Sequence, residues 1–248
     1  MRLRLLRQVS LLGLLLAGAA QAATVVMAFG EKIAPYCLPE TDSGIELEVI
    51  GEALAVRGHV LKPVYVPLAR VPFEFKYRKV DAAMTDLGED MRPHGGFYGD
   101  PAVVYDNVLI TLKHRNLHIS KPEDLLGLTV LSFQGASKRY PEWLAAVERR
   151  GQYFEQANQE LQVTTLDRQR YDVVLSDRYI YHYHANQVER DTGKPLLPVT
   201  EHRFTKINPN DYRPVFHDKK IRDDFNHGLA QIKKNGRFKA IYDKYLQK

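Results

Sequence analysis

The sequence of 248 residues contains a single cysteine, Cys37. The chain can therefore form no internal disulfide, and a metal centre held by several cysteine ligands is excluded. A nucleophilic thiol needs a base close by, and the residues around Cys37 show no pattern that supplies one. We interpret this cysteine as a small buried side chain without a chemical role.

A strong charge of one sign is also lacking. The chain has 35 Lys and Arg against 30 Asp and Glu, and Arg2, Arg4 and Arg7 all fall within the first seven residues. Without those three, 32 basic residues face 30 acidic ones. This balance is too even to indicate a nucleic acid or an anionic membrane as the partner.

Long hydrophobic runs are absent except for residues 11–17, which are too few to span a bilayer. This run follows the three arginines and precedes Ala20-Gln21-Ala22, a small-x-small pattern that signal peptidase cleaves. The order predicts a cleavable signal peptide over residues 1–22. The residue directly after the cleavage pattern is Ala23 and not a cysteine, so we expect a periplasmic protein without a lipid anchor.

The composition of the whole chain, 44% hydrophobic and 26% charged, is typical of a globular protein. Short apolar runs alternate with segments of helical spacing in two successive sets, which indicates parallel βαβ units. The predicted strands are 24–28, 64–66 and 80–84 in the first set, and 129–133, 163–164 and 173–175 in the second. The predicted helices are 45–54, 141–147 and two near the C-terminus, separated at Gly236.

One six-residue pattern occurs twice. Residues 81–86 and 172–177 both read Asp, three apolar residues, a hydroxyl residue and Asp. Ligands of open α/β sheets bind beyond the carboxyl ends of strands, where the second Asp of each pattern would lie. The repeat suggests two lobes that present matched edges to one cleft, although so loose a pattern also arises by chance.

Several short motifs carry a family resemblance. They are, in order, Ala34-Pro35-Tyr36, Val80-Asp81-Ala82-Ala83, Arg92, Tyr98-Gly99-Asp100-Pro101, residues 123–127, Gly135-Ala136-Ser137, residues 172–177 and residues 226–245. In this order the chain resembles the type II periplasmic solute-binding proteins, specifically extracellular solute-binding family 3, which serves polar amino-acid ABC transporters. The resemblance covers nearly the whole chain after the signal peptide.

This resemblance implies an α/β fold of two lobes, each a mostly parallel sheet flanked by helices, joined by two hinge crossings. Lobe I would comprise residues 23–110 and 207–248, and lobe II residues 111–206. Such proteins close about the hinge on their ligand. The implied partners are a small amino-acid-like ligand and an ABC permease of the inner membrane, with the protein a monomer that needs no cofactor or metal.

The resemblance also implies the polar anchors of the ligand. Arg92 would hold the carboxylate as a bidentate fork, and Asp177 would hold the ammonium. Asp177 is equally suited to capping the turn that follows it. Tyr36 would lie against the apolar part of the ligand, although a core tyrosine fits the same pattern.

A helix is expected to start at Gly135, Ala136 and Ser137, where free backbone amides attract an anion. Ser137 is also suited to being an ordinary N-cap. These three residues complete the binding groups that the resemblance implies on lobe II.

The chain departs from the family pattern at several positions. Ile33 and Leu68 stand where the family often has two aromatic residues, and Thr85 followed by Asp86 stands where it has serines. The Asp86 carboxylate would select a cationic ligand such as a basic amino acid or a polyamine, or it would merely pair with Arg92 or Arg70. The identity of the ligand stays open.

Three alternatives to transport remain. The first is a dehydratase-like enzyme on the same scaffold, with Asp86 and Asp177 as acid and base. The second is a sensor module that reports its ligand to a membrane partner. The third is metal capture by His182 and His184, which we consider the weakest because the segment after Asp177 is expected to be helical and would point the two rings apart.

Overall fold

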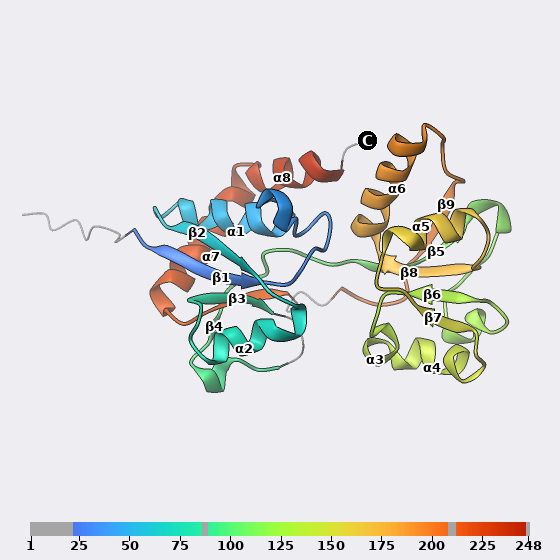
Figure 1. Ribbon diagram of the computed structural model, residues 1–248, viewed down its shortest axis with the longest axis horizontal. Helices are drawn as coiled ribbons and strands as arrows, with labels where there is room; N and C mark the ends of the chain where they lie inside the picture. The colour runs from blue at the N-terminus through green and yellow to red at the C-terminus, as the bar shows by residue number, and fades with distance from the viewer. Residues whose placement is uncertain (1–21, 86–88, 208–211, 247–248) are drawn as a thin grey trace, which may run out of the picture.

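The structure of the chain, a computed structural model, describes residues 22–85, 89–207 and 212–246 (Figure 1). Two five-stranded sheets lie side by side, each covered by helices, and they define a first and a second lobe. The predicted α/β class with two lobes is confirmed. Within the described residues, no helix has the length and apolar character needed to cross a membrane. The predicted signal peptide lies outside the described residues except for Ala22.

The sheet of the first lobe has the strand order β2-β1-β3-β10-β4. Its strands are β1 (Thr24–Phe29), β2 (Val60–Tyr65), β3 (Ala82–Thr85), β4 (Phe97–Tyr98) and β10 (Arg213–Phe216). β1 runs parallel to β2 and β3, whereas β10 is antiparallel to β3 and β4. Alternation along β1 sends Met27 and Phe29 into one core and Ala28 into another, so both faces of the sheet are buried.

Four helices cover these faces. They are α1 (Ile45–Ala55), α7 (Lys219–Lys234) and α8 (Arg237–Leu246) on one side, and α2 (Val71–Lys76) on the other (Figure 1). α1 and α7 pack so closely that a Cβ atom on Gly228 would lie 1.8 Å from the carbonyl oxygen of Ala53. Only glycine permits this approach, which seats the C-terminal part of the chain on the N-terminal part.

The sheet of the second lobe has the order β7-β6-β8-β5-β9. Its strands are β5 (Asn107–Leu112), β6 (Val130–Ser132), β7 (Tyr153–Glu155), β8 (Val173–Asp177) and β9 (Val199–His202). α3 (Ala136–Arg139) and α4 (Pro141–Arg149) cover one face, and α5 (Glu160–Asp167) and α6 (Arg178–Thr192) cover the other. The short helices η1 to η5 (Pro39–Thr41, Leu68–Arg70, Arg92–His94, Lys113–Arg115 and Pro122–Leu125) lie in the connections.

The two sheets share one topology. In each, three parallel strands are followed by two antiparallel pairings, through β10 and β4 in the first lobe and through β5 and β9 in the second. Each sheet is therefore mixed: four of its five strands run in one direction, in line with the mostly parallel sheets expected, and one, β10 or β5, is reversed. The reason is that β5 and β10 each follow a crossing from the other lobe and enter their sheet in the reverse direction.

The chain changes sheets twice, between Tyr98 and Asn107 and again between His202 and Arg213. The predicted lobe boundary near residue 110 lies inside β5, which pairs only within the second sheet. The predicted return near residue 207 lies between β9 and β10. The exact division of the lobes stays a prediction.

The repeated six-residue pattern occupies equivalent places in the two sheets. The Asp81 carboxylate accepts a hydrogen bond from the amide of Val26, and the Asp172 carboxylate accepts one from the amide of Thr129, both at 2.9 Å. The first Asp of each copy thus ties its own strand, the central one of the sheet, to the neighbouring parallel strand. Asp177, the second Asp of the later copy, ends β8, whereas Asp86 of the earlier copy lies outside the described residues.

One predicted strand is wrong. Residues 163 and 164 belong to α5, where Val163 and Leu166 are buried one turn apart on the same face. Two β-branched residues in succession do not reveal this helical period, so the run resembled a short strand.

Candidate functional site

A cavity of about 730 Å³ lies between the lobes. Both lobes and both crossings contribute to its wall. The lining residues are Gly30, Glu31, Ile33, Cys37, Glu46, Leu68 and Met84 from the first lobe; Asn107, Phe133, Gln134, Gly135, Lys138, Arg139, Ala157, Gln159, Asp177 and Ile180 from the second; and Tyr105 and Tyr212 from the crossings. This volume is within the range of cavities that hold small organic ligands.

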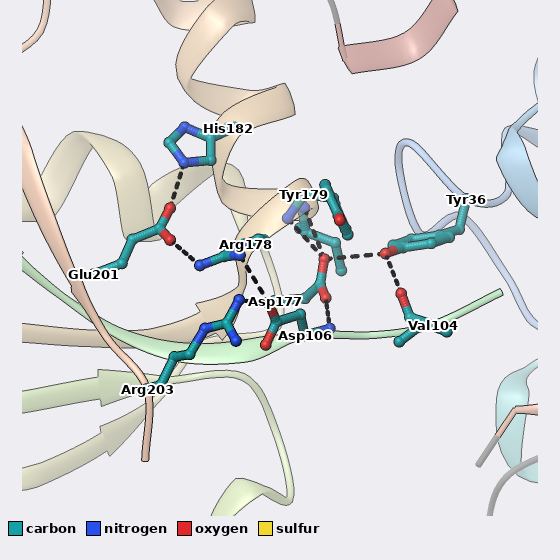
Figure 2. Close-up of polar contacts among 10 residues, drawn as sticks. Tyr36, Val104, Asp106, Asp177, Arg178, Tyr179, His182, Glu201 and Arg203 are labelled. Carbon is teal, nitrogen blue, oxygen red and sulfur yellow. Dashed lines mark hydrogen bonds and ion pairs between the residues drawn. The ribbon is translucent and has the colours of Figure 1, made fainter. Parts of the chain in front are cut away.

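Asp177 lines this cavity at the end of β8, where it also caps α6. Its Oδ1 accepts hydrogen bonds from the amides of Tyr179 at 2.9 Å and Ile180 at 3.0 Å, and its Oδ2 accepts one from the amide of Asp106 at 2.6 Å (Figure 2). The residue is only 2% exposed. Burial raises its pKa to about 7, although these amides act in the opposite direction.

Tyr36 lies behind the cavity wall and is fully buried. Its hydroxyl is 3.1 Å from the carbonyl oxygen of Val104 and 3.3 Å from Oδ1 of Asp177, and it can donate its one proton to either (Figure 2). Its ring stacks on Tyr105 with centroids 4.1 Å apart, and Tyr105 stacks on Tyr212 at 4.0 Å. This stack joins the first lobe to both crossings.

Ion pairs fix the start of α6 to the same crossings (Figure 2). Asp106, on the first crossing, pairs with Arg178 at 3.0 Å and with Arg203 of the second crossing at 3.7 Å. Arg178 also binds Glu201, which accepts a further contact from His182 at 2.6 Å. The contact with His182 is the main cause of the lowered pKa of Glu201. One network therefore holds both crossings to the helix that Asp177 caps.

At the predicted anion site, the start of α3, one backbone amide already donates to a carboxylate of the protein itself. Gly135 adopts the left-handed conformation with φ of +82° and lines the cavity, but its amide donates to the Glu155 carboxylate at 2.9 Å. Burial would raise the pKa of Glu155, but the Gly135 amide, the Tyr153 hydroxyl and the Ser137 amide lower it overall. Ala136 is buried and Ser137 is half-buried at the start of this four-residue helix.

Two predicted anchors lie outside the cavity lining. The side chain of Arg92 is 75% exposed, and its Nε donates to both carboxylate oxygens of Asp90, at 2.9 and 3.0 Å. The side chain of Arg70 is 58% exposed and pairs with Glu74 at 3.1 Å. Both roles stay predictions, and the structure does not bring either arginine to Asp177.

Some of the other predicted positions line the cavity and others do not. Thr85 ends β3, opposite Arg213 of β10, and Asp86 lies outside the described residues. Ile33 and Leu68, which stand where the family often has aromatic residues, both line the cavity. The structure therefore brings Asp177 and Gly135 together at the cavity, with Tyr36 directly behind them.

Sequence reasoning missed several cavity residues, among them the acidic Glu31 and Glu46, two aromatic residues and two basic ones. The aromatic ones, Tyr105 and Tyr212, lie on the crossings, where no periodic pattern marks them. The basic ones, Lys138 and Arg139, come three and four residues after Gly135, and that closeness was a signal available in the sequence. The Arg139 guanidinium lies 5.2 Å from the centre of the Tyr212 ring.

Cys37 also lines the cavity, but it is 1% exposed and its thiol donates a long contact of 3.5 Å to the carbonyl oxygen of Gly30. Burial raises its pKa to about 12, so the reactive thiolate is scarce at neutral pH. This agrees with a thiol without a chemical role.

His182 and His184 both lie on α6, which is helical as expected. His182 contacts Glu201, and burial lowers the pKa of His184. Among the described residues, no group of three or more His, Cys, Asp and Glu side chains is arranged to hold a metal ion.

No protein-family model and no curated protein matches this sequence. Many solved structures do match in fold. An ancestral cationic amino-acid solute-binding protein shares 18% identity with a TM-score of 0.68 over 90% of this chain and 96% of that one. The second substrate-binding domain of GlnP from Lactococcus lactis, in its open conformation, shares 20% identity with a TM-score of 0.62 over 91% and 96%.

A histidine kinase sensor domain with similarity to periplasmic binding proteins also matches in fold, with 19% identity and a TM-score of 0.63 over 90% of this chain and 96% of that one. The chain therefore has the two-lobed fold of the periplasmic solute-binding proteins, as its motifs predict. Identities this low establish the fold and leave the activity to be argued from the cavity.

Proposed function

We propose that the chain is an extracytoplasmic solute-binding protein that captures a small amino-acid-like zwitterion and delivers it to an ABC permease. The observation that carries this proposal is the cavity lined by both lobes and both crossings. A ligand in that cavity contacts both lobes at once, so its binding energy favours their closed arrangement. An ancestral cationic amino-acid solute-binding protein and an ancestral arginine-binding protein solved with arginine have the same fold.

The cavity also carries groups of both charges. Glu31, Glu46 and Asp177 are acidic, whereas Lys138 and Arg139 are basic. A zwitterion needs a partner for each of its charged ends once water is excluded. A purely apolar solute would offer no polar partner to these charged groups, so a dipolar ligand suits the wall better.

The dehydratase-like alternative has one point in its favour, because a pKa of about 7 suits a general acid or base. Against it, three of the donors around Asp177 are backbone amides, which hold the carboxylate in place as a cap. A catalytic group must exchange its proton with the substrate, and this carboxyl is 2% exposed. We therefore propose binding without turnover.

A thermal-shift screen of the chain from Ala23 onward tests this function. The ligands are the twenty standard amino acids, polyamines and dipeptides, each near neutral pH. A ligand at 100 times its Kd stabilises the folded state by about 2.7 kcal/mol, or about 5–10 °C in Tm for a chain of this size. Lys239→Gln, an exposed pair partner on α8, is the control variant.

A shift with at least one zwitterion, which is recovered unchanged after incubation, is the expected result. Failure of the whole panel contradicts an amino-acid-like ligand. Conversion of a stabilising ligand into product contradicts binding without turnover and favours the enzyme.

A further inference from the structure

The charged side chains of the cavity are divided by lobe. Glu31 and Glu46, the acidic residues other than Asp177, come from the first lobe, whereas the basic residues Lys138 and Arg139 come from α3 in the second lobe. The sequence motifs imply the reverse arrangement, with an arginine on the first lobe and an aspartate on the second.

The two implied anchors are already engaged. Arg92 is exposed, lies outside the lining and donates to both oxygens of Asp90. Asp177 receives two amide hydrogen bonds and the Tyr36 hydroxyl at Oδ1 and a short amide hydrogen bond at Oδ2. A ligand ammonium at Asp177 would have to compete with these donors, whose positions the start of α6 fixes.

By contrast, other charges at the cavity are better placed to receive a ligand. Within the described part of the chain, neither the Glu31 carboxylate nor the Lys138 ammonium makes an ion pair or a side-chain hydrogen bond, and the Lys138 charge acts on the Glu155 carboxylate only as a minor cause of its lowered pKa. Glu46 lies in the first turn of α1, where the positive end of the helix dipole stabilises its carboxylate. Arg139 and Glu46 have further contacts, so they would share their charge with a ligand.

We propose that the ligand binds with its anionic group on Lys138 and Arg139 of the second lobe and its cationic group on Glu31 and Glu46 of the first. This orientation is opposite to the one implied by Arg92 and Asp177, and it rests on the proposed function. Closure of the lobes then brings each charged end of a zwitterion against a wall of opposite charge. A ligand with two like charges leaves one wall uncompensated.

Nuclear magnetic resonance with two small ions tests the orientation before any ligand is known. The labelled chain from Ala23 onward is titrated with acetate and, separately, with methylammonium, with sodium chloride at equal ionic strength as the background. The proposal expects acetate to shift the side-chain signals of Lys138 and Arg139. It expects methylammonium to shift the carboxylate signals of Glu31 and Glu46.

Three variants sharpen this test. Lys138→Gln is expected to raise the acetate dissociation constant at least about tenfold, as for the loss of a charge-assisted hydrogen bond. Arg92→Gln, the competing anchor, is expected to change it by less than about twofold, as for an exposed charge. Lys194→Gln, an exposed lysine on the same lobe outside the lining, is the matched control.

The proposal is overturned if acetate shifts Arg92 and methylammonium shifts Asp177, or if either ion leaves its expected signals unchanged. It is also overturned if Arg92→Gln weakens acetate binding more than Lys138→Gln does. These outcomes are separate from the thermal-shift screen. Shifts at the expected groups with no stabilising zwitterion contradict the amino-acid-like ligand alone, whereas a stabilising zwitterion with the reversed shifts contradicts only the orientation.

Discussion

The buried carboxyl of Asp177 gives the stability of the protein a specific pH dependence. Its pKa rises from 3.8 to about 7 on folding, mainly because of burial. The folded state therefore holds this proton more tightly than the unfolded state, so the stabilisation is fully present below pH 3.8 and is lost as the pH rises towards 7. This difference in pKa between the folded and unfolded states corresponds to about 4 kcal/mol in the free energy of unfolding.

The substitution Asp177→Asn removes the titration and keeps the shape of the side chain. It also places an amide donor where an oxygen accepts the Asp106 or Ile180 amide, which costs about 1–3 kcal/mol at every pH. The free energy of unfolding of the wild type is therefore expected to exceed that of the variant most at pH 4.5. The difference should fall by several kcal/mol up to pH 8.

Urea unfolding of both proteins at half-unit steps of pH measures this difference. Asp191→Asn, at an exposed aspartate near the end of α6, supplies the background from a surface carboxylate. A difference that stays constant from pH 4.5 to pH 8 would refute the reasoning, because it would show that the four donors around Asp177 fully offset the cost of burying its charge.

Two further substitutions follow from the contacts behind the cavity. Tyr36→Phe removes a buried hydroxyl that lies against Val104 and Asp177, and we expect urea unfolding to show a loss of about 1–2 kcal/mol; an unchanged stability would mean that neither contact contributes. Arg178→Gln breaks the pairs with Asp106 and Glu201, and we expect a loss of about 2–3 kcal/mol, with Arg190→Gln at an exposed part of α6 as the control. Equal losses in both arginine variants would contradict the role of the network at the crossings.

The sequence was sufficient for the parts of the fold that depend on local pattern. The apolar run of β1, the helical spacing of α1 and the turn glycine before α3 each reflect contacts within a few residues. The repeated Asp pattern also marked equivalent strands, because Asp81 and Asp172 make the same tie to a neighbouring strand. Local rules therefore predicted both lobes.

The pairing of strands far apart in the sequence could not be read in this way. β10 lies between β3 and β4, which precede it by more than a hundred residues, and its direction is set by the crossing from the second lobe. The alternation of apolar residues is the same for parallel and antiparallel neighbours. The sequence consequently predicted the strands that run in one direction but not the one reversed strand of each sheet.

Residues of the candidate site that end a strand could be predicted from the sequence, whereas residues that reach the cavity from a loop could not. Asp177 was expected at the end of β8 and lies there, whereas Tyr105 and Tyr212 reach the cavity from irregular crossings. The sequence around Arg92 contained a sign that its side chain would bind a neighbouring carboxylate. Asp90 lies two residues earlier, which is close enough for the carboxylate to bind both the amide and the side chain of Arg92.

The two roles that the sequence allowed for Asp177 compete for the same lone pairs. A cap must accept amides of the helix it starts, and here two of these meet at Oδ1 together with the Tyr36 hydroxyl. Every donor that fixes the carboxylate reduces what it can offer to a ligand. The charge that recognises a zwitterion is therefore expected on groups that the fold leaves less engaged, and Glu31 and Lys138 are the residues of the cavity that meet this condition from opposite lobes.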